Sequence, residues 1–143
     1  MPIVTAHSLK FLIVDDEPFN LLALDGLLRL SNFEHIVEAY DGTHALKMME
    51  ENKYDIDVIL TDYQMPGCNG VQLAEEVRHL QQQGIVKSSL QIILVSGDRF
   101  NQEFDTFDIA GVMRPLFDEK LMKPFSNADL KKVLTLVSLV STK

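Results

Sequence analysis

Residues 91–96 read QIILVS, and within this stretch four apolar side chains, Ile92 to Val95, follow one another without a polar break. A strand with one face in water alternates apolar and polar residues, whereas a strand buried on both faces carries an unbroken apolar run. Strands of the second kind occur in parallel sheets that helices cover on each side. We therefore predict that residues 91–95 form a central strand of such a sheet.

The sequence on either side repeats a strand followed by a helix. Short apolar stretches predict four more strands, at residues 11–14, 35–39, 58–61 and 120–122. Apolar residues at helical spacing predict helices at 20–30, at 43–51, after Gly70, at about 101–110, and from Ser126 onward. The last helix opens with Ser126 and Asp129, which have the spacing of a capping box. Five strand–helix pairs predict an α/β fold with a parallel sheet between two helical layers.

Length and charge restrict the class of protein. A chain of 143 residues has the length of one domain, and we expect a flexible N-terminus over 1–8 and one domain over 9–143. The 13 basic and 21 acidic side chains give a net charge of −8, which opposes binding to nucleic acid. No apolar run approaches the roughly 18 residues of a membrane span, so no membrane contact is expected. Without a signal-peptide pattern, the expected location is cytoplasmic.

Four of the predicted strands end beside residues that can bind ions. In open parallel sheets, ligands bind beyond the carboxyl ends of the strands, so residues that follow different strands meet at one edge. The side chains expected at this edge are Asp15, Asp16 and Glu17 after the first strand, Asp62 after the third, Ser96 after the fourth and Lys123 after the fifth.

This set of side chains fits phosphoryl transfer assisted by a metal ion. Neighbouring carboxylates repel one another unless a cation neutralises them, and ligands that are all oxygen favour a hard ion such as Mg²⁺. Phosphoryl transfer needs an in-line nucleophile, a metal ion, a fixed cation and a hydrogen-bond donor. Asp62, the metal ion, Lys123 and Ser96 would supply these four parts.

Four motifs in this order resemble the receiver domains of two-component response regulators. They are FLIVDDE at 11–17, LTDYQMPGCNG at 60–70, ILVSG at 93–97 and LMKPF at 121–125. The resemblance covers residues 10–140, so the domain expected over 9–143 would be a receiver domain. It implies a flavodoxin-like (βα)5 fold, a three-layer sandwich whose five parallel strands lie in the order 2-1-3-4-5.

The resemblance also implies the ligands of a Mg²⁺ ion. Asp62 would be both the phosphoacceptor and a metal ligand. Asp16 would bind the ion directly, and Asp15 would bind it through water. The backbone carbonyl of Gln64 would complete the protein's share of the coordination.

Two further residues would bind the phosphoryl group. The Ser96 hydroxyl would donate to the phosphoryl oxygens and Lys123 would pair with them, with a cis peptide bond expected before Pro124. The phosphodonor would be a histidine kinase or a histidine phosphotransfer protein. The chain would catalyse only its own phosphorylation and dephosphorylation, and would pass the signal to a further protein partner through a phosphorylation-dependent surface.

The residues of the site are also compatible with two other functions. A phosphatase of the haloacid-dehalogenase type also uses an aspartate nucleophile, Mg²⁺, a hydroxyl and a lysine, but its second acid stands two residues after the nucleophile, where this chain has Gln64. A docking module with the same fold but without phosphorylation is the other alternative.

One position departs from the receiver pattern. Lys120 stands three residues before Lys123, where receiver domains commonly have a tyrosine or phenylalanine that moves with the Ser/Thr on phosphorylation. This difference puts the usual readout in doubt, although it leaves the chemistry of Asp62 intact. The sequence fits both a free single-domain regulator and the receiver part of a hybrid histidine kinase, and the pattern around Gln64 favours the second setting.

Overall fold

A five-stranded parallel sheet forms the centre of the molecule. The computed structural model describes residues 9–97, 106–109 and 111–141. The sheet contains β1 (Lys10–Val14), β2 (His35–Ala39), β3 (Val58–Asp62), β4 (Gln91–Ser96) and β7 (Glu119–Met122). Their order is β2-β1-β3-β4-β7, which confirms the predicted order, with β7 as the fifth strand. The flexible N-terminus predicted over 1–8 lies outside the described residues.

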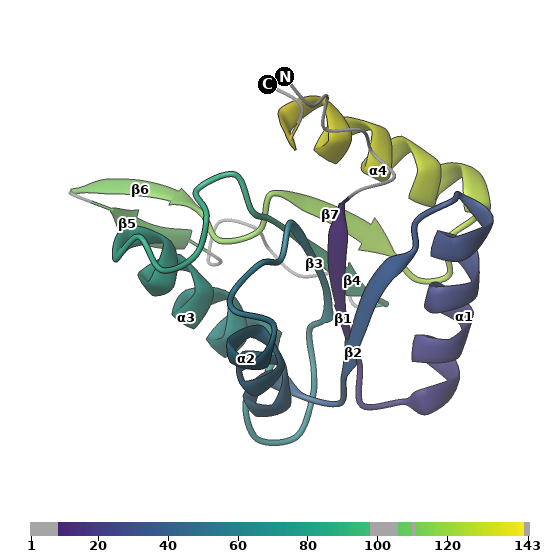
Figure 1. The fold of residues 1–143 in the computed structure, drawn as a ribbon, viewed down its shortest axis with the longest axis horizontal. Helices are drawn as coiled ribbons and strands as arrows, with labels where there is room; N and C mark the ends of the chain where they lie inside the picture. The colour runs from purple at the N-terminus through teal and green to yellow at the C-terminus, as the bar shows by residue number, and fades with distance from the viewer. Residues whose placement is uncertain (1–8, 98–105, 110, 142–143) are drawn as a thin grey trace.

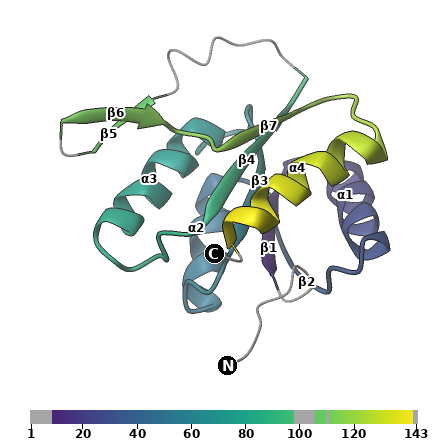
Figure 2. The ribbon, with the colours of Figure 1, turned by 90° about the horizontal axis from the view of Figure 1, so that it is seen from above.

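Helices cover both faces of the sheet and enclose two apolar cores. The helices α1 (Pro18–Leu30) and α4 (Asn127–Ser141) pack on one face, whereas α2 (Gly42–Glu51) and α3 (Gly70–Gln82) pack on the other (Figures 1 and 2). The alternating side chains of β4 explain its unbroken apolar run. Ile92 and Leu94 belong to the core under α2 and α3, while Ile93 and Val95 belong to the core under α1 and α4. The three-layer architecture expected from the sequence is therefore confirmed.

Local sequence signals start the helices. The Asn69 side chain accepts a hydrogen bond from the Gln72 N–H, and the Gln72 side chain accepts one from the Asn69 N–H, so α3 opens with a capping box. The box predicted for α4 is also present, with Asp129 N–H donating to Ser126 Oγ and Ser126 N–H donating to Asp129 Oδ2, both at 3.0 Å. These caps fix where α3 and α4 leave the edge of the sheet.

The helix predicted at 101–110 is wrong for its last part. Residues Thr106–Ile109 form β5, which pairs antiparallel with β6 (Val112–Pro115). Gly111 takes a positive φ of 84° in the turn, a conformation that glycine adopts without strain. Phe107 is buried while Asp108 is exposed, which is the two-residue period of a strand. The remainder of the predicted helix, residues 101–105 and 110, lies outside the described residues.

A buried arginine holds the connection from this hairpin to β7. The Nε and Nη2 atoms of Arg78 on α3 donate to the Leu116 carbonyl at 3.1 and 2.7 Å, and Nη2 also donates to Asp118 Oδ2 at 2.9 Å. The same Asp118 oxygen accepts the Ile92 N–H at 2.7 Å. Arg78 therefore joins α3, β4 and the start of β7 through one guanidinium group.

Charged residues join the strands at the opposite, amino-terminal edge of the sheet. The Asp55 carboxylate accepts from Lys10 Nζ at 2.7 Å and from Lys87 Nζ at 2.9 Å. These hydrogen bonds, from Lys10 first and then from Lys87, lower the pKa of Asp55 to about 2. Among the described residues, no helix is both long enough and apolar enough to cross a membrane.

Candidate functional site

Three carboxylates meet where β1 and β3 end. The two strands are neighbours in the sheet, with Val14 paired to Thr61, so the residues that follow them come close together. Asp15, Asp16 and Asp62 each offer an oxygen, and these atoms all lie within 4.8 Å of one another. Asp15 is buried, Asp62 is half-buried and Asp16 is exposed. The structure thus brings together the three acids that the sequence predicted as metal ligands, and their oxygens could hold a metal ion.

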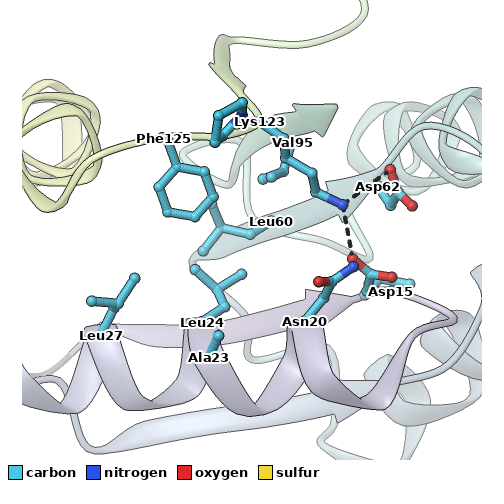
Figure 3. A pocket seen from close by; sticks show the side chains of 12 residues that line it. Asp15, Asn20, Ala23, Leu24, Leu27, Leu60, Asp62, Val95, Lys123 and Phe125 are labelled. Carbon is cyan, nitrogen blue, oxygen red and sulfur yellow. Dashed lines mark hydrogen bonds and ion pairs between the residues drawn. The ribbon is translucent and has the colours of Figure 1, made fainter. Parts of the chain in front are cut away.

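Lys123 reaches this cluster from the end of β7. Its Nζ atom lies 3.2 Å from Asp15 Oδ2 and 3.7 Å from Asp62 Oδ1, as Figure 3 shows. The peptide bond between Lys123 and Pro124 is cis, as expected. The Lys123 backbone N–H donates to the Ser96 carbonyl at 2.8 Å, so the ends of β4 and β7 are joined directly beside the acids.

The surroundings of Asp62 disfavour its charged form. Burial raises the pKa of Asp62 above its ordinary value, and the carboxylates of Asp15 and Asp16 raise this pKa further. The Lys123 ammonium and the Tyr63 N–H, which donates to Asp62 Oδ1 at 2.8 Å, act in the opposite direction. A carboxylate in this position gains stability from a bound cation.

The loop after β3 can close on the site only because residue 70 is glycine. A Cβ atom at Gly70 would overlap the carbonyl oxygen of Asp62. The Gly70 N–H donates to the Tyr63 carbonyl at 2.9 Å, which brings the start of α3 back against the end of β3. Gly70 therefore allows the start of α3 to pack directly against the end of β3, where Asp62 stands.

An apolar cavity opens beside the carboxylates. It has a volume of about 340 Å³, and its polar end is formed by Asp15, Asp62, Lys123 and Asn20. The apolar walls come from α1, β3, β4 and the start of the α4 segment, through Ala23, Leu24, Leu27, Leu60, Val95 and Phe125 (Figure 3). Sequence reasoning missed Asn20 and Phe125. In the sequence, the helical spacing of Asn20 with Leu24 and Leu27 is the signal that these three residues share one face of α1.

The other predicted site residues lie at or near the same edge. Ser96 is buried, with an exposed fraction of 3%, at the end of β4. Gln64 is exposed two residues after Asp62. Glu17 is exposed, and its N–H donates to Asp15 Oδ1 at 2.9 Å, so its backbone orients that carboxylate. Lys120 lies on β7 in register with Leu94 and is partly buried.

The geometry agrees with a comparison to known families. The family model of the response regulator receiver domain matches residues 11–135, a range that runs from the second residue of β1 into α4 and includes the acidic edge. The chain belongs to this family. A receiver domain is a module of two-component signalling, and the four motifs described above all lie within the matched residues.

Known proteins resemble this receiver domain over most of its length. Chemotaxis protein CheY-3 of Vibrio cholerae is 30% identical over 134 residues, which are 94% of this chain and 95% of that protein. Stress response regulator protein 1 of Lodderomyces elongisporus is 34% identical over 113 residues, which are 78% of this chain and 29% of that protein. A response regulator receiver domain protein from Clostridium thermocellum has the same fold, with a TM-score of 0.72, 22% identity and coverage of 93% and 96% of the two chains.

Proposed function

We propose that Asp62 accepts a phosphoryl group from a phosphohistidine of a histidine kinase or histidine phosphotransfer protein, with the help of Mg²⁺. The observation that carries this proposal is the meeting of Asp15, Asp16 and Asp62 within 4.8 Å, with Lys123 beside two of them. Membership of the receiver family supports it.

The residues at the edge fit Mg²⁺. Their side-chain donors are all carboxylate oxygens, the ligands that this hard ion prefers, and a cluster open to solvent at Asp16 leaves room for bound water. Asp16 and Asp62 would hold the ion directly, Asp15 through water, and the Gln64 backbone carbonyl would complete the set. When bound, the ion supplies positive charge that offsets the charge of the transferring phosphoryl group.

The chain's own side chains carry out the transfer. An Asp62 oxygen forms the new bond to phosphorus while the bond between phosphorus and the donor's histidine nitrogen breaks, and the imidazole keeps the electron pair and takes a proton. Lys123, which contacts Asp15 and Asp62 in the unphosphorylated protein, pairs with the phosphoryl oxygens. The Ser96 hydroxyl donates to another of these oxygens.

Phosphorylation would change the connection between β4 and β7. Ser96 and Lys123 lie at the two ends of this connection, and the hydrogen bond from the Lys123 N–H to the Ser96 carbonyl joins them. When both side chains turn to the phosphoryl group, the hairpin of β5 and β6 and the strand β7 are the elements that move. Lys120 stands where receiver domains commonly have an aromatic residue. The partner would therefore recognise the phosphorylated state through the changed position of this hairpin and β7, and not through the reorientation of an aromatic side chain.

The partner would contact α1 and the cavity beside Asp62. Phe19 and Leu22 on α1 are 80% and 68% exposed, and the apolar cavity opens between this helix and Phe125. Apolar side chains of a partner could therefore be buried next to the acids, which would place the phosphohistidine over Asp62.

A small phosphodonor tests the chemistry without a partner. Wild type, Asp62→Asn and the control Asp25→Asn on α1 are incubated with acetyl phosphate and Mg²⁺, and the intact mass is measured. We expect one added phosphoryl group on wild type and on the control, and none on Asp62→Asn. Equal labelling of wild type and Asp62→Asn would defeat the proposal. Sustained turnover of a generic phosphoester would favour the phosphatase alternative, and a lack of any Mg²⁺ response that depends on Asp16 would favour the docking module.

A further inference from the structure

A second cavity lies under the hairpin of β5 and β6, away from the acidic edge. It has a volume of about 340 Å³, which falls within the range of small-molecule sites, about 300–1,000 Å³. Its walls come from α3, from the loop before β4, from the hairpin, and from the residues that lead into β7. The lining side chains that could select a ligand are Arg78, Arg114, Asp118, Phe107 and Phe117.

The charge of this lining favours an anion. The Oδ2 atom of Asp118 is paired with Arg78 at 2.9 Å and accepts the Ile92 N–H, so the negative charge of Asp118 is offset by Arg78. Arg114 is exposed on β6, and its guanidinium has no hydrogen bond or ion pair to any described residue. The lining contains two arginines and one aspartate, so it carries a net positive charge, although the net charge of the whole chain is −8. A small anion would be attracted here against the general field of the protein.

Arg78 offers one further donor. A guanidinium has five N–H groups. Four of those on Arg78 donate to Leu116, Asp118 and Gln81, with two of the four going to the Leu116 carbonyl. The fifth, on Nη1, has no partner within the part of the chain that the structure describes, and the side chain is only 9% exposed. A buried charged donor without a protein acceptor favours an acceptor atom from a ligand or from water.

Two aromatic rings line the same cavity. Phe107 and Phe117 are buried, with exposed fractions of 7% and 6%, and the Phe107 ring makes an edge-on contact with His79 at a centroid distance of 5.0 Å. The two rings therefore give the cavity an apolar floor, of which only a small part is accessible. We infer that the cavity binds a small organic anion, with its apolar part against the portions of Phe107 and Phe117 that line the cavity and its carboxylate or phosphate on Arg114 and on Nη1 of Arg78.

This site goes beyond the proposed phosphoryl transfer and does not require it. A bound anion would hold the hairpin against α3, because Arg114 belongs to β6 and Arg78 belongs to α3. The ligand would therefore stabilise one position of the connection between β4 and β7. A small carboxylate and a nucleotide share the required chemistry, and separate probes distinguish them.

Calorimetric titration of the unphosphorylated chain tests the inference. The anionic probes are benzoate and adenosine monophosphate, and their uncharged counterparts are benzyl alcohol and adenosine. We expect at least one anion to bind more tightly than its counterpart, and Arg114→Gln to weaken that binding about tenfold or more, the loss expected for one charged hydrogen bond. The control Arg29→Gln on the far face should bind like wild type.

The two anions separate the possible sources. Binding of benzoate alone would indicate a small aromatic carboxylate, whereas binding of adenosine monophosphate would indicate a nucleotide. The inference is overturned if neither anion binds more tightly than its uncharged counterpart, or if Arg114→Gln binds as tightly as wild type. Asp62 takes no part in this measurement, so its result is independent of phosphorylation.

Discussion

Replacing Arg78 with methionine removes the charge that joins α3 to the start of β7 while keeping much of the side chain's length. Four hydrogen bonds are lost, and among the described residues the Oδ2 atom of Asp118 keeps only the Ile92 N–H as a donor. The Asp118 side chain is 30% exposed, so its charge is not left buried when the arginine is removed. The main loss is at the buried Leu116 carbonyl, which gives up both of its Arg78 donors, and a buried acceptor without a partner costs about 1–3 kcal/mol. We expect Arg78→Met to lower the free energy of unfolding by roughly 1–3 kcal/mol, out of the roughly 5–15 kcal/mol available to a domain.

Urea unfolding followed by circular dichroism measures this loss. With a slope of about 2 kcal/mol per M, the midpoint should fall by about 0.5–1.5 M. The matched control is Arg29→Met, because Arg29 makes an exposed pair with Asp25 four residues away, at 3.0 Å. Such a pair contributes only about 0.3–0.5 kcal/mol. If the two variants lose similar, small amounts of stability, the assigned role of Arg78 is wrong.

Three further predictions concern the two edges of the sheet. Gly70→Ala should lower the free energy of unfolding by about 1–3 kcal/mol and slow the phosphorylation of Asp62, because the added Cβ would overlap the Asp62 carbonyl. In the control Gly26→Ala on α1, the added Cβ meets no described atom within 4 Å, so this variant should gain up to about 1 kcal/mol. Urea unfolding measures both changes. The folded pKa of Asp55, about 2, is lower than its ordinary 3.8, so this carboxylate stabilises the fold above pH 3.8 and loses that contribution as the pH falls toward 2. The stability deficit of Asp55→Asn, measured by thermal unfolding across pH, should accordingly shrink over this interval, and a constant deficit would refute the assignment. The pKa of Asp62 is raised in the folded protein, so the charged form of this side chain destabilises the fold at neutral pH. Asp62→Asn should therefore raise the melting temperature at pH 7, and this gain should fade in acid as Asp62 of the wild type becomes protonated. A lower melting temperature of Asp62→Asn at pH 7 would contradict this reasoning.

Much of the fold could be predicted because the sheet is buried on both faces. The apolar runs of β1, β3 and β4 leave little choice between strand and helix, and the predicted bounds of β2 and those observed coincide at His35–Ala39. The candidate site followed from the same reasoning, since residues after parallel strands must share one edge. Asp15, Asp16, Asp62 and Lys123 meet there, although they are far apart in the chain.

The connection between β4 and β7 could not be predicted in the same way. Phe107 has helical spacing with Phe104, but the burial of its ring beside α3 and the turn at Gly111 produce a strand instead. Tertiary packing outweighs local periodicity in a short segment such as this one. Arg78 looks like an ordinary polar residue of α3, because its acceptors lie 38 and 40 residues later and only the folded chain brings them together.

Titration with Mg²⁺, followed through the backbone amide signals of the unphosphorylated protein, tests the metal site most directly. We expect saturable shifts centred on residues 15–16 and 62–64, and the loss of these shifts in Asp16→Asn, with the control Asp25→Asn behaving like wild type. An absent response at these residues, or an equal response in Asp16→Asn, would show that the three carboxylates do not act together on one divalent ion.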